Sequence, residues 1–497
     1  MPDIIDTLTT TIAMQETALR ASILPNREAA LVALVRAQDR LLDGLDVTQG
    51  PPFDLIHGSR LANPGGSLAI CLALGDPQTP GCIATSASPG TRAHERLTAC
   101  AGLVDAKQVL AHLASGFMRG EVQPDGSLAV WIAQKRVPPP WRERIDLAWW
   151  DARSHRLGGA DRQGLSDWQF GFLPDAIVAG NPAHTWTDAV RLLVARLGHD
   201  APLPVAETEI LRTLIEALGL TPEIAIQILS AMTVGPPNAA WHAAVPGIAA
   251  APFVRLGPET LMPSSVGLRT QPLLFLAREL RRRDPQSWHN AAHQREAAFR
   301  HDIATVFADK RFVHAPARIQ LRREGGSLRT DIDAAIFDRK TGTLAVFELK
   351  AQDPFSRSAE ELDRRRDNLL AANRQLAGIL DWTKRHTPDE ILDRIDHQTA
   401  KRFKVQRVLP FVLARTLARF IDGPPPDKRA AWGAWPDVLR LHDAGVLDPT
   451  NGNPLQTLFT RLQTGTDPSI PPDTPPHLIR LGNLTITVSP NRPTPPS

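Results

Sequence analysis

The chain has 497 residues, of which 42% are hydrophobic and 22% are charged, and its formal net charge at pH 7 is +3. This length exceeds what one hydrophobic core supports and predicts a multi-domain globular protein, and the small positive charge allows an anionic partner without identifying one. Residues 1–13 do not resemble a secretory signal, and no stretch approaches about eighteen uninterrupted apolar residues, so we expect a cytoplasmic protein with no membrane contact.

Residues 1–250 are predicted to form one or more mainly helical domains with some β structure. An apolar stripe at helical spacing runs through residues 31–45 and ends before Pro51-Pro52, and short apolar runs at 67–74 and 128–133 indicate some strand content. Helical stretches follow at Thr187–Leu197 and Glu207–Leu218, and Thr221-Pro222 marks the start of another helix, with Thr as the N-cap. None of these residues indicates a catalytic or ligand-binding role.

A stretch rich in Pro, Gly and Ala at 235–265 has the composition of a linker, so we place the last large domain at 265–415. Residues 416–497 are predicted as a short extension with helices around Trp435–His442. Its Pro-rich tail at 490–497 is predicted to be disordered.

The segment that indicates chemistry is a predicted β-hairpin at 329–350. Two apolar runs flank a polar turn that contains Gly342, and Glu348 and Lys350 project from the same face of the second strand. Burying this carboxylate and ammonium in an apolar strand is unfavourable unless they pair or meet a metal ion.

Folding the hairpin about its turn brings Asp333 roughly opposite Glu348. Two carboxylates beside one lysine suit Mg²⁺ or Mn²⁺, which can polarise a phosphodiester and lower the pKa of a bound water. Lys350 would orient that water or help deprotonate it, and would offset the charge of the transition state.

Here the chain resembles the PD-(D/E)xK nuclease superfamily, over about residues 288–415. The resemblance implies a restriction-endonuclease-like α/β domain of order αβββαβ with a mixed central sheet. The sequence supplies the elements in that order: a helix at 291–308, strands at 313–321, 329–337 and 343–350, a helix at 359–382 and a strand at 405–413.

By this resemblance, Asp333 and Glu348 are the metal ligands and Lys350 completes the ExK element. Asp331 is the alternative acid. The family's second helix often carries a Gln facing the site, which corresponds to Gln375, and its first helix often carries a Glu, for which Glu296 is preferred over Asp302. The Pro that often precedes the first acid in this family is missing here.

Other motifs have ordinary interpretations. The triplets Asp105-Ala-Lys107 and Asp338-Arg-Lys340 match D-x-K by chance and are expected to be solvated charge, as is the run 364–366 of three arginines, whose alternative role is contact with phosphates. His289 and His293 have a zinc-binding spacing, but Asn290 stands where a metalloprotease needs Glu. The 3 cysteines form no CxxC pair, as expected in a reducing compartment.

The sequence therefore predicts a Mg²⁺- or Mn²⁺-dependent nuclease acting on nucleic acid, with DNA favoured over RNA. Two other classes stay open: a catalytically inactive nucleic-acid-binding or assembly protein that keeps the fold, and a protein-interaction scaffold. A homodimer, and a protein partner bound through residues 1–250, are both compatible with the sequence.

Overall fold

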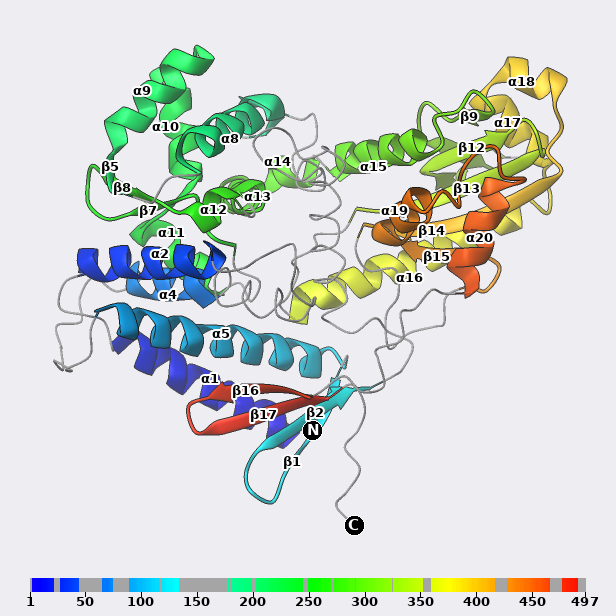
Figure 1. The fold of residues 1–497 in the computed structure, drawn as a ribbon. Helices are drawn as coiled ribbons and strands as arrows, with labels where there is room; N and C mark the ends of the chain where they lie inside the picture. Colours follow the sequence, from blue (N-terminus) through cyan, green and yellow to red (C-terminus); the bar gives the residue numbers. More distant parts are fainter. Residues whose placement is uncertain are drawn as a thin grey trace.

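A computed structural model describes residues 2–21, 27–43, 65–74, 89–116, 118–133, 177–178, 181–198, 203–244, 249–269, 272–290, 292–323, 325–351, 359–415, 427–464 and 476–489. These residues form a mixed α/β structure with a mainly helical N-terminal region and several sheets. Figure 1 shows an N-terminal group of helices, a second helical group above it, and an α/β group at the upper right. None of the described helices has the length and apolar content needed to cross a membrane.

The N-terminal group contains four described helices and a hairpin. They are α1 (Pro2–Ala21), α2 (Arg27–Asp43), α4 (Gly66–Leu74), α5 (Pro89–Ala114), β1 (Met118–Val122) and β2 (Leu128–Ile132). Leu31, Leu34 and Val35 are buried on α2, as the helical stripe predicts, while residues 44–50 lie outside the described part. The run at 67–74 forms a helix rather than a strand. Every residue of α4 is buried, and a fully apolar helix has no periodic pattern that distinguishes it from a buried strand.

A hairpin near the C-terminus completes the sheet of the N-terminal group. β16 (His477–Leu481) and β17 (Leu484–Ser489) extend the order to β1-β2-β17-β16, with β17 parallel to β2 (Figure 1). Ile479 and Ile486 are buried in the same core as α1 and α5. The prediction of a helical extension for 416–497 is therefore incomplete, and the tail at 490–497 lies outside the described residues.

The second helical group follows. Its described elements are β3 (Ile177–Val178), β4 (Asn181–Pro182), α8 (Ala183–Leu197), β5 (Val205–Ala206), α9 (Glu207–Leu218), α10 (Pro222–Ala231), β6 (Thr233–Val234), α11 (Pro236–Ala244), β7 (Phe253–Arg255), β8 (Thr260–Pro263), α12 (Ser265–Arg269), α13 (Pro272–Arg283) and α14 (Pro285–Asn290). The three predicted helices are confirmed, and the Thr221 hydroxyl caps α10 by accepting a hydrogen bond from the Ile224 amide at 3.4 Å.

The stretch 235–265 is a packed part of this fold rather than the expected linker. It contains α11, β7 and β8, and its small residues Ala239, Ala243 and Ala249 are buried. The neighbouring Gly267 allows a close approach of two segments, because a Cβ at this position would lie 2.0 Å from the Ala251 carbonyl oxygen. Small side chains therefore serve close packing here, although the same composition is typical of linkers.

A buried ionic network joins α11 to α13. The fully buried Glu279 carboxylate accepts hydrogen bonds from Arg282 at 2.7 Å and Arg283 at 2.8 Å, and its second oxygen lies 3.1 Å from His242 Nε2. The His242 ring stacks on Phe275. Burial lowers the pKa of His242 despite the opposing effect of Glu279, so the folded protein holds this imidazole neutral.

We expect His242 to make the folded protein less stable as pH falls from 7 to 5. The unfolded chain binds a proton at this histidine near its ordinary pKa of about 6.5, whereas the folded chain binds it only at lower pH. One such proton contributes at most about 1.4 kcal/mol per pH unit. Chemical denaturation at both pH values should show a smaller loss in His242→Gln than in wild type. His301→Gln at an exposed site should keep the wild-type loss, and equal behaviour of the two variants would contradict the assignment.

The α/β group surrounds a five-stranded sheet. Its elements are α15 (Ala292–Val306), β9 (Phe312–His314), β10 (Ile319–Arg322), β11 (Leu328–Ile332), β12 (Ala334–Asp338), β13 (Thr343–Lys350), α16 (Ala359–Trp382), α17 (Pro388–Ile395), α18 (His397–Arg402), β14 (Arg407–Ala414), β15 (Ala431–Ala434), α19 (Trp435–Asp443) and α20 (Pro454–Thr464). The strand order is β15-β14-β13-β12-β9. β12 is antiparallel to β9 and β13, whereas β14 is parallel to β13 and β15, so the sheet is mixed as predicted.

Different helices cover the two faces of this sheet. Val346 of β13 is buried in a cluster with Ile379 of α16, whereas Phe347 stacks on Phe411 of β14 at 4.7 Å in a cluster that includes residues of α15 and α20. Because side chains alternate along a strand, Glu348 and Lys350 lie on the same face as Val346, toward α16.

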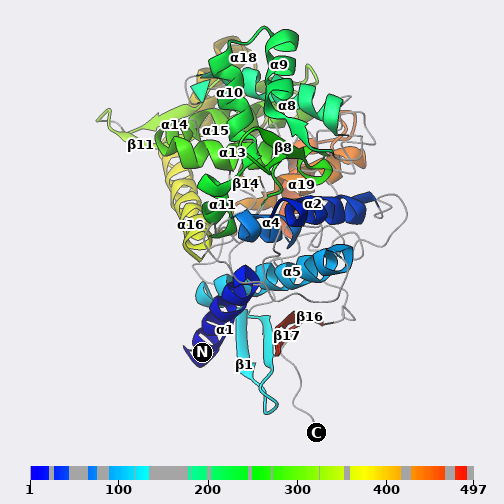
Figure 2. The same ribbon diagram turned by 90° about the vertical axis from the view of Figure 1, so that its left-hand side faces the viewer.

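Two predicted strands are each divided into two. The segment predicted at 313–321 forms β9 and β10, separated by a connection that contains Pro316, which cannot donate to a strand ladder. The segment predicted at 329–337 is interrupted at Asp333 into β11 and β12. β10 and β11 pair only with each other, as a two-stranded arm that projects from the body in Figure 2.

Candidate functional site

The β12–β13 hairpin places Asp333 beside Glu348. Ala334 pairs with Phe347, and the Asp333 amide donates to the Phe347 carbonyl at 3.1 Å. The Asp333 carboxylate in turn accepts a hydrogen bond from the Leu349 amide at 2.8 Å. Gly342 allows the connecting turn because its φ is +67°. Asp333 is thus held by backbone hydrogen bonds at the point where the arm leaves the sheet.

Lys350 and Gln375 meet Glu348 on the α16 face. The Lys350 Nζ donates to Glu348 Oε1 at 2.6 Å and to Gln375 Oε1 at 3.0 Å. The second predicted helix therefore does carry a Gln that contacts the lysine of the ExK element. Gly378, one turn further along α16, brings the helix close to β11, since a Cβ at this position would lie 3.3 Å from Thr330 Cβ.

The two carboxyl groups are buried and lack full compensation. The Glu348 side chain is 0% exposed, and its Oε2 is buried without a hydrogen-bond partner among the described residues. Burial, together with the Asp333 carboxylate, raises the pKa of Glu348 to about 8, against the opposing effect of Lys350. Burial also raises the pKa of Asp333 to about 6, and the Leu349 amide opposes this shift. Both groups therefore resist ionisation in the folded protein even with Lys350 beside Glu348, and a divalent cation bound between them would favour their anionic forms.

The remaining predicted acids are placed differently. Glu296 on α15 lies near enough to Asp333 to contribute to its raised pKa. Asp331 pairs instead with Arg318 at 2.9 Å, and Asp302 pairs with Arg415. Among the described residues, no three His, Cys, Asp or Glu side chains gather into a metal-binding group, so Glu296 does not complete a three-ligand cluster with Asp333 and Glu348.

Arg300 on α15 also contacts Asp333, although it was not among the residues predicted from the sequence. Its Nε donates a hydrogen bond to the Asp333 carbonyl oxygen, and its guanidinium interacts with Asp333 and Glu296. The available signal was its spacing of four residues from Glu296, which places both side chains on one face of the helix. Arg300 therefore helps to hold the backbone that carries Asp333.

The residues fit a magnesium-type ion. Mg²⁺ is commonly bound by only one or two carboxylates and keeps several water ligands, so Asp333 and Glu348 suffice as its protein side-chain ligands. The buried Glu348 oxygen without a partner is the atom that such an ion would satisfy.

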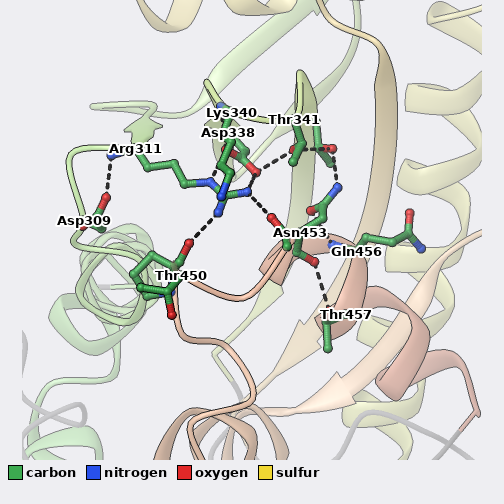
Figure 3. Close-up of polar contacts among 12 residues, drawn as sticks. Asp309, Arg311, Asp338, Lys340, Thr341, Thr450, Asn453, Gln456 and Thr457 are labelled. Atoms are coloured by element: carbon green, nitrogen blue, oxygen red, sulfur yellow. Dashed lines mark hydrogen bonds and ion pairs between the residues drawn. The ribbon is translucent and has the colours of Figure 1, made fainter.

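In the two other D-x-K triplets the acids are buried rather than solvated as expected, whereas Lys340 is exposed as predicted. Asp338 is fully buried, and the Arg311 guanidinium binds it through two hydrogen bonds, as Figure 3 shows. Asp105 is buried, and Lys107 pairs with Glu16 at 3.1 Å. In each triplet, a segment distant in sequence supplies the partner of a charged side chain, and a local motif does not reveal such a partner.

The arginine run, the histidine pair and the cysteines lie in different environments. Arg364 is exposed but Arg365 is buried, so the run at 364–366 is not a uniformly solvated face, and the Arg366 side chain lies outside the described residues. His289 is exposed, while the His293 side chain and residue Cys82 are likewise outside the described part. The two described cysteines, Cys71 and Cys100, are buried free thiols.

Comparison of the chain with protein-family models, with curated proteins and with solved structures gives no match. A function for this protein must therefore be inferred from its own residues.

Proposed function

We propose that this protein is a metal-dependent nuclease that hydrolyses phosphodiester bonds of nucleic acid, with DNA as the favoured substrate. The observation that carries the proposal is the buried Glu348 carboxyl group, whose Oε2 has no hydrogen-bond partner among the described residues. Asp333 places a second carboxyl group beside it. Two neighbouring buried carboxyl groups that share a single lysine are costly to ionise, and they are retained most readily where they bind a cation.

Each side chain has a role consistent with its contacts. Asp333 and Glu348 would hold Mg²⁺ or Mn²⁺, which when bound polarises a phosphodiester and lowers the pKa of a coordinated water. Lys350 positions the attacking water and offsets the charge that develops on the phosphate. Gln375 holds the Lys350 ammonium at 3.0 Å, and Arg300 anchors the Asp333 backbone.

The order of elements supports a restriction-endonuclease-like fold for this region. α15 precedes the antiparallel strands β9, β12 and β13, α16 follows, and β14 adds parallel to β13. This arrangement agrees with the αβββαβ order of the PD-(D/E)xK superfamily, which the chain resembles. In this proposal the β10–β11 arm is an insertion between β9 and β12, the first two strands of that unit.

The test is cleavage of plasmid and single-stranded DNA by the purified full-length protein with Mg²⁺, with Mn²⁺ or with EDTA. We expect cleavage with either ion and none with EDTA, because water activation at the site depends on the cation. Restoring Mg²⁺ in excess over EDTA should restore cleavage. Cleavage that persists in EDTA would exclude the metal, and absence of cleavage under all conditions would contradict the nuclease.

A further inference from the structure

The β10–β11 arm is exposed at its tip and anchored at its base. Ile319 and Leu321 are buried against α16 and α17, whereas the described residues from Arg322 to Arg329 are exposed. Figure 2 shows the arm extending beyond the neighbouring helices. It is therefore fixed in direction by packing while its end is free to contact another molecule.

Cations gather where the arm meets the end of α16. The exposed members are Arg322, Arg323, Arg329, Lys384, Arg385 and Arg394, here called the arm surface. Three segments contribute to it, and Trp382 joins them: its Nε1 donates to the Arg322 carbonyl at 2.9 Å, and Arg394 lies over its ring at 5.7 Å. Arg329 and Lys384 share the single carboxylate of Asp381.

We propose that the arm surface binds the phosphate backbone of duplex DNA, with the tip of the arm entering a groove. This inference rests on the proposed nuclease function and specifies its substrate. β11 leads directly into Asp333, and Trp382 follows Gln375 by two turns of α16, about 10 Å along the helix axis.

Two features favour duplex over single-stranded nucleic acid. A two-stranded β-ribbon fits the major groove of B-DNA, and Leu328, which is 52% exposed, supplies an apolar side chain to meet base edges there. Single-strand binders instead stack bases on exposed aromatic rings. Trp382, the aromatic residue that joins the segments of the arm surface, is buried and stacks on His386 at 4.1 Å, so its ring is not free to stack on a base.

The test compares full-length wild type with the double variant Arg323→Ala/Arg385→Ala. Both side chains are exposed, and neither forms an ion pair with a described residue, so folding should be unaffected. Binding to a labelled duplex and to its single strand is measured by fluorescence anisotropy in EDTA over a range of salt concentrations. We expect weaker duplex binding and a slope of log affinity against log salt that is shallower by about 2. The control Arg119→Ala/Arg212→Ala, at exposed sites outside the arm surface, should match wild type.

The outcomes separate this inference from the proposed function. Unchanged duplex affinity in the arm variant would overturn the arm surface, whatever the cleavage assay shows. A loss confined to single strands would overturn the duplex assignment. If wild type binds neither form at low salt, the arm surface and the nuclease are both wrong. If binding follows the expectation but no metal supports cleavage, the arm surface stands without the nuclease.

Discussion

Asp333→Asn should abolish detectable DNA cleavage while leaving the protein at least as stable as wild type in EDTA. The amide oxygen can still accept the hydrogen bond that the Leu349 amide donates to Asp333 at 2.8 Å. The substitution removes one of two buried carboxylates, and with it the repulsion that contributes to the raised pKa of Glu348. Loss of a ligand charge lowers affinity for a hard divalent cation. The readouts are cleavage rate with Mg²⁺ and unfolding free energy in EDTA.

Lys350→Ala should reduce the cleavage rate about 10²–10³-fold, as removal of one group that stabilises a transition state typically does. Lys340→Ala is a matched control, because Lys340 ends another D-x-K triplet in the same hairpin but is exposed and lies in the turn. It should cleave at the wild-type rate. If Asp333→Asn destabilised the protein and both lysine variants cleaved equally, the Glu348–Lys350 pair would be a structural ion pair and the proposed site would be wrong.

The β12–β13 hairpin could be predicted because its determinants are local. Apolar runs on both sides of a turn at Gly342 specify two paired strands, and the register then follows from the chain itself. The hairpin of β16 and β17 has comparable signals: Ile479 and Ile486 alternate with less buried residues, and Gly482-Asn483 forms the turn. Its place could not be predicted, because the pattern of a strand shows which face is buried and not which distant strand, here β2, lies beside it.

The candidate site was predictable only as far as local spacing reaches. Asp331 and Asp333 are two residues apart and would share one face of a continuous strand, so periodicity does not separate them. The structure separates the two acids. Asp333 lies at the junction between β11 and β12, whereas Asp331 lies within β11 and pairs with Arg318. The approach of α15, which brings Arg300 to the Asp333 carbonyl, depends on packing between elements and has no counterpart in a strand pattern.

Arg311→Ala should lower the unfolding free energy by about 3–5 kcal/mol, the usual effect of leaving a buried charge without its partner. The Asp338 side chain is 0% exposed and that of Arg311 is 9% exposed, so solvent screens this pair weakly. Figure 3 shows the Arg311 side chain pointing at Asp338, close to Thr450 and Asn453. The same guanidinium donates to the Pro449 and Gly452 carbonyl oxygens, so it also ties the loop before α20 to the hairpin.

Chemical denaturation of Arg311→Ala, Asp338→Ala and the double variant would measure this interaction directly. We expect the double variant to lose less stability than the two single losses combined, since removing both charges leaves neither one buried alone. Lys340→Ala, in the same turn but exposed, should change stability by less than about 0.5 kcal/mol. Asp338 is the last residue of β12, whereas Asp333 directly precedes the first, so the two lie at opposite ends of the strand, about 17 Å apart. Folded Arg311→Ala at low temperature should therefore cleave DNA at the wild-type rate, and a loss of both stability and cleavage per folded molecule would show that the two ends of the hairpin are coupled.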